Sequence, residues 1–133
     1  MNKSLFLCFC LVGLSAGCNT PKWTEPPLKK VEEVDDRLKM KRTFTAYEVE
    51  GGHQLVKHGV YTSYYPTGSK YIEMTYKYGL ADGKCIIYTQ EGRPATVGWY
   101  AGGKPWEGDI QVGEFIRRFH KGKDHGIRQD SER

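Results

Sequence analysis

A spacing of about 24 residues recurs through the second half of this 133-residue chain. Five of the six offsets between the first two copies are identical, and the last is longer by a single position. The first copy is Gly59, Tyr64, Gly68, Tyr76, Gly79 and Gly83, and the second is Gly83, Tyr88, Gly92, Tyr100, Gly103 and Gly108. A shortened third copy is Phe119, Gly122, Lys123 and Gly126. A period of this size predicts stacked units, each of which buries its apolar stripe only against its neighbours.

Aromatic and β-branched residues fill the segments between these glycines, a composition typical of antiparallel strands. We expect strands over 43–50, 61–65 and 84–89, each followed by a glycine-containing turn. Tight hairpin turns need positive φ, which glycine adopts without strain. The turn glycines predicted in this way are Gly59, Gly68, Gly79, Gly83, Gly92, Gly103, Gly108, Gly122 and Gly126. The sequence therefore predicts an all-β fold, a meander of hairpins over 43–126 with a tail at 127–133.

The pattern Gly-x-x-x-x-Tyr, then a turn glycine, then Tyr-x-x-Gly, resembles the MORN repeat in the form found in bacterial antitoxin-type and envelope proteins. The resemblance covers residues 59–126. It implies a single curved antiparallel sheet of repeated hairpins that serves as a binding or scaffolding module, without a catalytic constellation of its own. The matched residues are turn glycines and packing aromatics, which carry information about the fold and almost none about a partner.

A different pattern occupies residues 28–41. Leu28, Val31, Val34 and Leu38 follow one another at spacings of three, three and four, with acidic residues between them. This spacing predicts a short amphipathic helix, which would need a surface to pack on because isolated helices of this length are marginal in water.

The N-terminus has the layout of a cleavable secretory signal. Lys3 precedes an apolar segment of about ten residues, and the small residues Ser15, Ala16 and Gly17 precede Cys18. The segment is shorter than the roughly 20 apolar residues that a spanning helix needs. The stretch 14–18 resembles a bacterial lipobox, which implies cleavage after residue 17 and acylation of Cys18. The alternative is an ordinary signal peptide that contains a cysteine. Proline-rich residues 18–27 would then be a lipidated tether, whose nine residues after Cys18 reach at most about 30 Å.

Loss of residues 1–17 would change the cysteine and charge counts. Cys8 and Cys10 would leave with the signal, and acylation would consume Cys18, so Cys85 would be the only free thiol. One of the 20 basic residues would also be lost, leaving 19 against 16 acidic residues. This balance, with acidic residues interleaved among the basic ones near the C-terminus, argues against a nucleic-acid partner.

Alternation along the strands suggests two different faces. One face is expected to carry Thr62, Tyr64, Met74, Tyr76, Ile86, Tyr88 and Tyr100. The other is expected to be polar in the first unit and apolar later, with Cys85 beside a candidate binding set of Ile87, Val97, Trp99, Ile110 and Val112. An apolar outer face of this kind needs a cover. The candidates are the helix at 28–38, a second copy of the chain, or another protein.

Catalytic and metal-binding signatures are weak in this sequence. Residues 79–84 resemble a phosphate-binding loop, but they have three residues between the glycines where four are needed, and Cys85 replaces the Ser or Thr. His120 and His125 lie near Asp124, yet solvent-facing histidines of turns explain them better than metal ligands do. We therefore expect no enzyme activity, no cofactor and no metal.

These observations predict a lipid-anchored MORN-like protein of the bacterial cell envelope that acts by binding an unknown protein. In a Gram-negative host, Asn19 after Cys18 would favour the outer membrane, because sorting rules of the lipoprotein family reserve Asp at that position for retention. The alternatives are an immunity or antitoxin component that neutralises a toxin, and a peripheral binder of lipid headgroups. Homo-oligomerisation through the apolar face is also open.

Overall fold

The computed structural model describes residues 25–49, 51 and 54–129. The expected signal peptide at 1–17, Cys18, the tether up to residue 24 and the last four residues of the tail lie outside the described residues. Within these ranges the chain is all-β and contains no helix, so none is long and apolar enough to cross a membrane.

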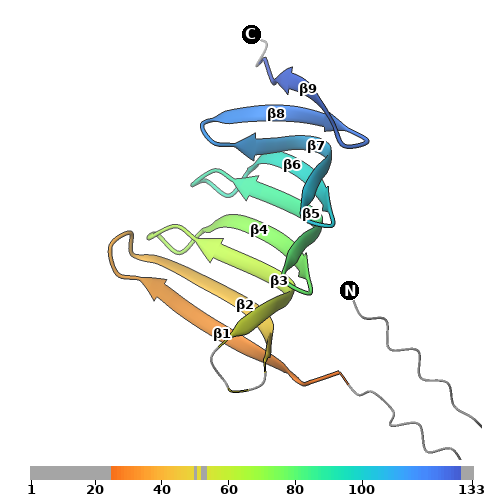
Figure 1. Cartoon of the computed structure of the whole chain (residues 1–133). Helices are drawn as coiled ribbons and strands as arrows, with labels where there is room; N and C mark the ends of the chain where they lie inside the picture. The colour runs from red at the N-terminus through yellow and green to blue at the C-terminus, as the bar shows by residue number, and fades with distance from the viewer. Residues whose placement is uncertain (1–24, 50, 52–53, 130–133) are drawn as a thin grey trace, which may run out of the picture.

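Nine strands form a single open antiparallel sheet in which each strand pairs with its neighbour in the sequence. Figure 1 shows this order as a twisted ribbon of hairpins running from β1 to β9. The strands are β1 (Leu28–Asp35), β2 (Met40–Glu48), β3 (Leu55–Tyr64), β4 (Lys70–Lys77), β5 (Leu80–Tyr88), β6 (Pro94–Ala101), β7 (Lys104–Val112), β8 (Phe115–His120) and β9 (Lys123–Ile127). The strands expected at 43–50, 61–65 and 84–89 correspond to β2, β3 and β5, each of which begins earlier than expected and ends one or two residues sooner.

The helix predicted at 28–41 is wrong, because this segment forms β1, a turn and the start of β2. Charged residues that a helix would have placed on its outer face are instead cross-strand partners. Lys41 Nζ lies 2.9 Å from Glu32, and Arg42 Nε lies 3.6 Å from Glu33. The Asp35 carboxylate accepts hydrogen bonds from the two N–H groups at residues 37 and 38, which closes the turn. Pairing with β2 therefore overrides the local spacing, as tertiary context often does for short helical patterns.

The boundaries of the sheet shift accordingly. It begins at Leu28 rather than at residue 43, and it ends at Ile127, inside the segment expected to be a tail. Arg128, the next residue, still contacts the sheet, because its Nη1 donates a hydrogen bond to the carbonyl oxygen of Ala95 at 3.1 Å.

The same backbone pairing returns in successive hairpins. A strand glycine lies opposite an aromatic residue at Gly59–Tyr76, Gly83–Tyr100 and Gly108–Phe119. Hydrogen bonds of 2.8 Å also join three turn glycines to the preceding hairpin, from Gly79 N–H to Lys57 O, from Gly103 N–H to Ala81 O and from Gly122 N–H to Trp106 O. An aromatic ring opposite a glycine covers backbone that the glycine leaves bare.

The turns supply the left-handed conformations that this chain path requires. All nine glycines predicted as turn residues have positive φ, between 75° and 119°. Five of them, Gly68, Gly79, Gly92, Gly103 and Gly122, lie in turns between strands. The prediction of a turn is wrong for the other four, Gly59, Gly83, Gly108 and Gly126, which lie inside β3, β5, β7 and β9. Two tight turns instead begin with a larger residue at positive φ, Tyr78 at 49° and Lys121 at 48°. In the turn between them along the sheet, the corresponding residue is Gly102, at 55°.

The core is thin because the sheet has nothing packed on it within the described residues. The buried apolar residues are Phe44, Ala46, Tyr47, Cys85 and Ile110. Thr62, Ser63 and Thr96 are also buried, and no large side chain falls below 2% exposure among the residues described. Stability therefore rests on cross-strand pairs and on one shallow apolar stripe.

Candidate functional site: an apolar pocket on one face of the sheet

The register of the strands determines which residues share a face, because residues directly opposite each other in a ladder point to the same side. One continuous row is Tyr61, Met74, Cys85 and Gly98, and a second on the same face is Ser63, Ile72, Ile87 and Thr96. The opposite face carries the row Thr62, Glu73, Ile86 and Val97. The two faces are thus composed differently from the sequence-based expectation.

That expectation placed Met74 and Cys85 on opposite faces, but the two residues pair directly and share one face. It also grouped Ile87 with Val97, although Ile87 pairs with Thr96 while Val97 pairs with Ile86. A one-residue change of register moves a side chain to the other face, and register shifts occur in β3–β4, β4–β5, β5–β6 and β6–β7. Strict alternation along the sequence cannot account for these shifts.

A pocket of about 270 Å³ opens on the face that carries Met74, Cys85 and Ile87. Its apolar wall consists of Ile72, Met74, Cys85, Ile87 and Ile110, and its aromatic wall consists of Tyr71 and Tyr100. Thr96, Asp109, Gln111 and Gly113 complete the lining. A mostly apolar hollow with a few polar groups is the usual form of a binding site.

Ile110 is the most buried apolar side chain of the pocket, at 3% exposure, and Gly98 makes room for it. A Cβ atom at position 98 would lie 2.5 Å from Ile110 Cγ1 and 2.9 Å from the carbonyl oxygen of Asp109. The floor of the pocket is therefore built by close approach of β6 and β7 at a glycine, which fixes its depth.

The Cys85 thiol lies at this floor and is 7% exposed. Burial raises the pKa of Cys85 to about 11, so the thiol keeps its proton at neutral pH. A protonated, buried thiol is neither a good nucleophile nor a good metal ligand, and Cys85 acts in the pocket as a small apolar residue.

The five predicted binding residues are divided by the structure. Ile87 and Ile110 line the pocket. Trp99 pairs with Lys84 on the opposite face, where Lys84 Nζ lies 5.8 Å from its ring centroid. Val97 shares that face, and Val112 is 43% exposed at the end of β7. Sequence reasoning missed Ile72, Tyr71 and Gln111, although the alternating Ile72, Met74 and Tyr76 carried a signal for one apolar face.

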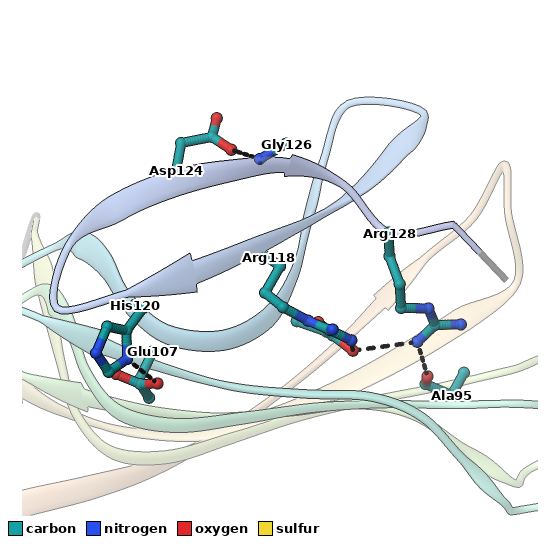
Figure 2. A network of polar contacts seen from close by, with 8 residues as sticks. Ala95, Glu107, Arg118, His120, Asp124, Gly126 and Arg128 are labelled. Carbon is teal, nitrogen blue, oxygen red and sulfur yellow. Dashed lines mark hydrogen bonds and ion pairs between the residues drawn. The ribbon is translucent and has the colours of Figure 1, made fainter. Parts of the chain in front are cut away.

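A second group of side chains lies near the C-terminal end of the sheet, and it is polar (Figure 2). Asp109 accepts hydrogen bonds from Arg118 Nε at 2.9 Å and from Arg128 Nη1 at 3.5 Å. His120 Nδ1 lies 3.0 Å from Glu107 Oε1, and Asp124 accepts a 2.8 Å hydrogen bond from the Gly126 N–H. Within the described part of the chain, no group of three or more His, Cys, Asp and Glu side chains is arranged to hold a metal ion.

The Asp109 carboxylate joins β7 to β8 and to the segment that follows β9, so its removal is expected to lower stability. The hydrogen bond from Arg118 holds the pKa of Asp109 below its usual value, helped by the charges of Arg118 and Arg128. A lowered pKa in the folded state means that this contribution is complete above about pH 4 and is lost as pH falls through the folded pKa.

We expect Asp109→Ala to lower the free energy of unfolding by about 1 to 2 kcal/mol at pH 7, since Arg118 is largely exposed and its share is screened. Urea unfolding at pH 7 and at pH 3 measures the effect, and the gap between variant and parent should shrink at pH 3. Glu114→Ala, in the exposed turn after β7, is the matched control and should change stability little. A gap that stays constant with pH would show that Asp109 stabilises by packing alone.

Comparison with known proteins gives no support from similarity. No family model, no curated protein and no solved structure matches this chain.

Proposed function

We propose that this chain is a lipid-anchored, non-catalytic binding module of a bacterial cell envelope, built of MORN-like hairpin repeats with a period of about 24 residues. The recurring pairs Gly59–Tyr76 and Gly83–Tyr100, one repeat apart, support the repeat. The stretch 14–18 with its terminal cysteine supports the anchor. The tether after Cys18 leads to β1, which begins at Leu28.

The observation that carries the binding role is the pocket beside Ile87 and Ile110. It lies on the face of an open sheet, and in the described residues no second layer covers that face. Its lining is apolar and aromatic, with a polar rim that includes Gln111 and Asp109. The thiol in its lining, that of Cys85, is buried and protonated, so the lining favours binding over thiol chemistry.

The partner is expected to be a protein that inserts an apolar side chain into this pocket. Buried anchors of this kind supply most of the binding energy of protein interfaces. Placing a lysine in the pocket should therefore abolish binding, because an unpaired charge would be buried on association.

Ile87→Lys tests this role, and Val60→Lys is its matched control. Val60 lies in β3, is 53% exposed and pairs with Thr75, which places it on the face opposite the pocket. We expect covalent cross-linking in the native envelope, followed by mass spectrometry, to recover a partner with the parent chain and with Val60→Lys. Ile87→Lys should lose it by about tenfold or more.

Size-exclusion chromatography with light scattering of the same three proteins separates a foreign partner from a second copy of the chain. Loss of a dimer in Ile87→Lys alone would identify the chain itself as the partner. Equal recovery of the partner by Ile87→Lys and by the parent chain would refute a binding role for the pocket.

A further inference from the structure

A lysine ammonium lies next to the apolar pocket, on the same face of the sheet. Lys57 Nζ lies 5.3 or 5.4 Å from the centroids of three aromatic rings, those of Phe44, Tyr61 and Tyr76. Tyr61 pairs across the ladder with Met74, which belongs to the wall of the pocket. The pocket and the positive charge are therefore neighbours, and a ligand in the pocket would lie close to both.

The charge of Lys57 has aromatic partners but no acidic one. In the part of the chain that the structure describes, this half-buried lysine contacts ring faces and forms no ion pair. Arg42 lies on the same face, and its Nε and Nη2 atoms are 3.6 Å from Glu33 and 3.7 Å from Asp35. A ring face attracts a cation, but it gives the three N–H donors of an ammonium no oxygen acceptor. A carboxylate from a partner would supply one.

We propose that the partner binds through an extended segment that places an acidic side chain on Lys57 and an apolar side chain in the pocket above Cys85. This inference rests on the proposed function, because it names the kind of partner that the pocket would bind. The apolar side chain would supply most of the binding energy, and the opposite charges would fix the direction of the segment. The rings around the ammonium exclude part of the water, which strengthens its attraction to a carboxylate.

The register of the sheet predicts the spacing of the two side chains in the partner. Tyr61, Met74 and Cys85 form one row across β3, β4 and β5, so two strand spacings separate the ammonium from the floor of the pocket. Two spacings are about 10 Å, and an extended chain advances about 3.3 Å per residue. The acidic residue should therefore lie about three positions from the apolar one, in a segment that crosses the strands.

The test is a selection of displayed random peptides on the purified full chain. We expect the enriched peptides to carry Asp or Glu about three positions from a large apolar residue. Fluorescence anisotropy then measures the affinity of one enriched peptide, made synthetically. Replacement of its acidic residue by the corresponding amide should weaken binding by about tenfold, because an ionic hydrogen bond is lost.

Variants of Lys57 show whether the acidic residue binds where we propose. Lys57→Gln should weaken binding of the acidic peptide by about tenfold and should leave binding of the amide peptide unchanged, since both changes remove the same ion pair. Lys57→Arg keeps a cation that stacks on ring faces and should retain most of the affinity. Lys84→Gln is the matched control, because Lys84 lies over the ring of Trp99, at 5.8 Å, on the opposite face. It should change the affinity by less than about twofold, and circular dichroism checks that each variant is folded.

The possible failures separate this inference from the proposed function. Enriched peptides that need Ile87 but carry no acidic residue, or that bind Lys57→Gln as tightly as the parent chain, would overturn the inference. The pocket would then take a wholly apolar segment, and the proposed function would stand. A selection that yields no peptide whose binding is abolished by Ile87→Lys would refute the pocket as a binding site, and this inference with it.

Discussion

Gly108→Ala is expected to lower the free energy of unfolding by about 3 kcal/mol or more. This is a large share of the total free energy of unfolding of a small domain. A Cβ atom at this position would lie 2.5 Å from the carbonyl oxygen of Val97 and 3.0 Å from the Cα atom of Gly98. Both are backbone atoms of the neighbouring strand β6, so neither can rotate away. The φ of Gly108 is 84°, which adds the strain of a left-handed alanine.

Gly92→Ala separates the two causes. Gly92 has almost the same φ, 83°, but a Cβ atom there would meet nothing within 4 Å. The control should therefore lose only about 1 kcal/mol, from backbone strain alone. Urea unfolding followed by circular dichroism measures both variants, and equal losses would show that β6 and β7 do not approach each other as closely as described.

Cys18→Ser is expected to abolish acylation of the chain completely. Formation of a thioether needs a thiolate, and a serine hydroxyl is a far weaker nucleophile. Without cleavage after residue 17, the apolar segment would also remain attached and could hold the chain at the membrane. Incorporation of labelled fatty acid is therefore the decisive measurement, rather than fractionation of membranes.

Cys85→Ser is the matched control for the anchor. Cys85 is buried in the sheet, and burial raises the pKa of its thiol to about 11, so it should not accept a lipid. The control protein should incorporate label like the parent chain. Label that persists in Cys18→Ser would remove the basis for the proposed anchor, although the binding role of the pocket would be unaffected.

The β-sheet could be predicted because its signals are local. Each turn needs a residue at positive φ, glycine is the usual solution, and Gly68 and Gly92 therefore mark hairpins without knowledge of the fold. The difference between Gly92 and Gly108 could not be predicted in this way. Both glycines have positive φ, but only Gly108 lies against the backbone of another strand, and that approach exists only in the assembled sheet.

The segment 28–41 shows how a local pattern can mislead. Its apolar spacing fits a helix, yet Val34 is 60% exposed and Leu38 is 62% exposed, so the stripe buries little. The ion pairs of Glu32 with Lys41 and of Glu33 with Arg42 depend on the pairing of β1 with β2. That pairing depends on residues of both strands, so a search for helical spacing within one segment does not detect it.

The candidate sites could be predicted only in part for a related reason. Of the predicted binding residues, Ile87 and Ile110 line the pocket, but Val97 lies on the other face because the register of the sheet shifts. The hydrogen bonds that the Tyr47 and Tyr78 hydroxyls donate to the Glu25 carboxylate also have no sequence motif. The two tyrosines are 22 and 53 residues from Glu25 in the sequence, and the three residues meet only because β1 adds to the edge of the sheet beside β2.

The pairing of every strand with its sequence neighbour also has a consequence for how the chain folds and how it can change. Because paired strands follow one another in the sequence, loop closure costs little entropy and a hairpin can add to one already formed. Hairpins at the two ends can open while the middle stays folded, because each hairpin is stabilised only by the hairpins next to it. Duplication of one repeat unit would lengthen the sheet without rebuilding a shared interior, which gives such a protein a simple route to a larger binding surface.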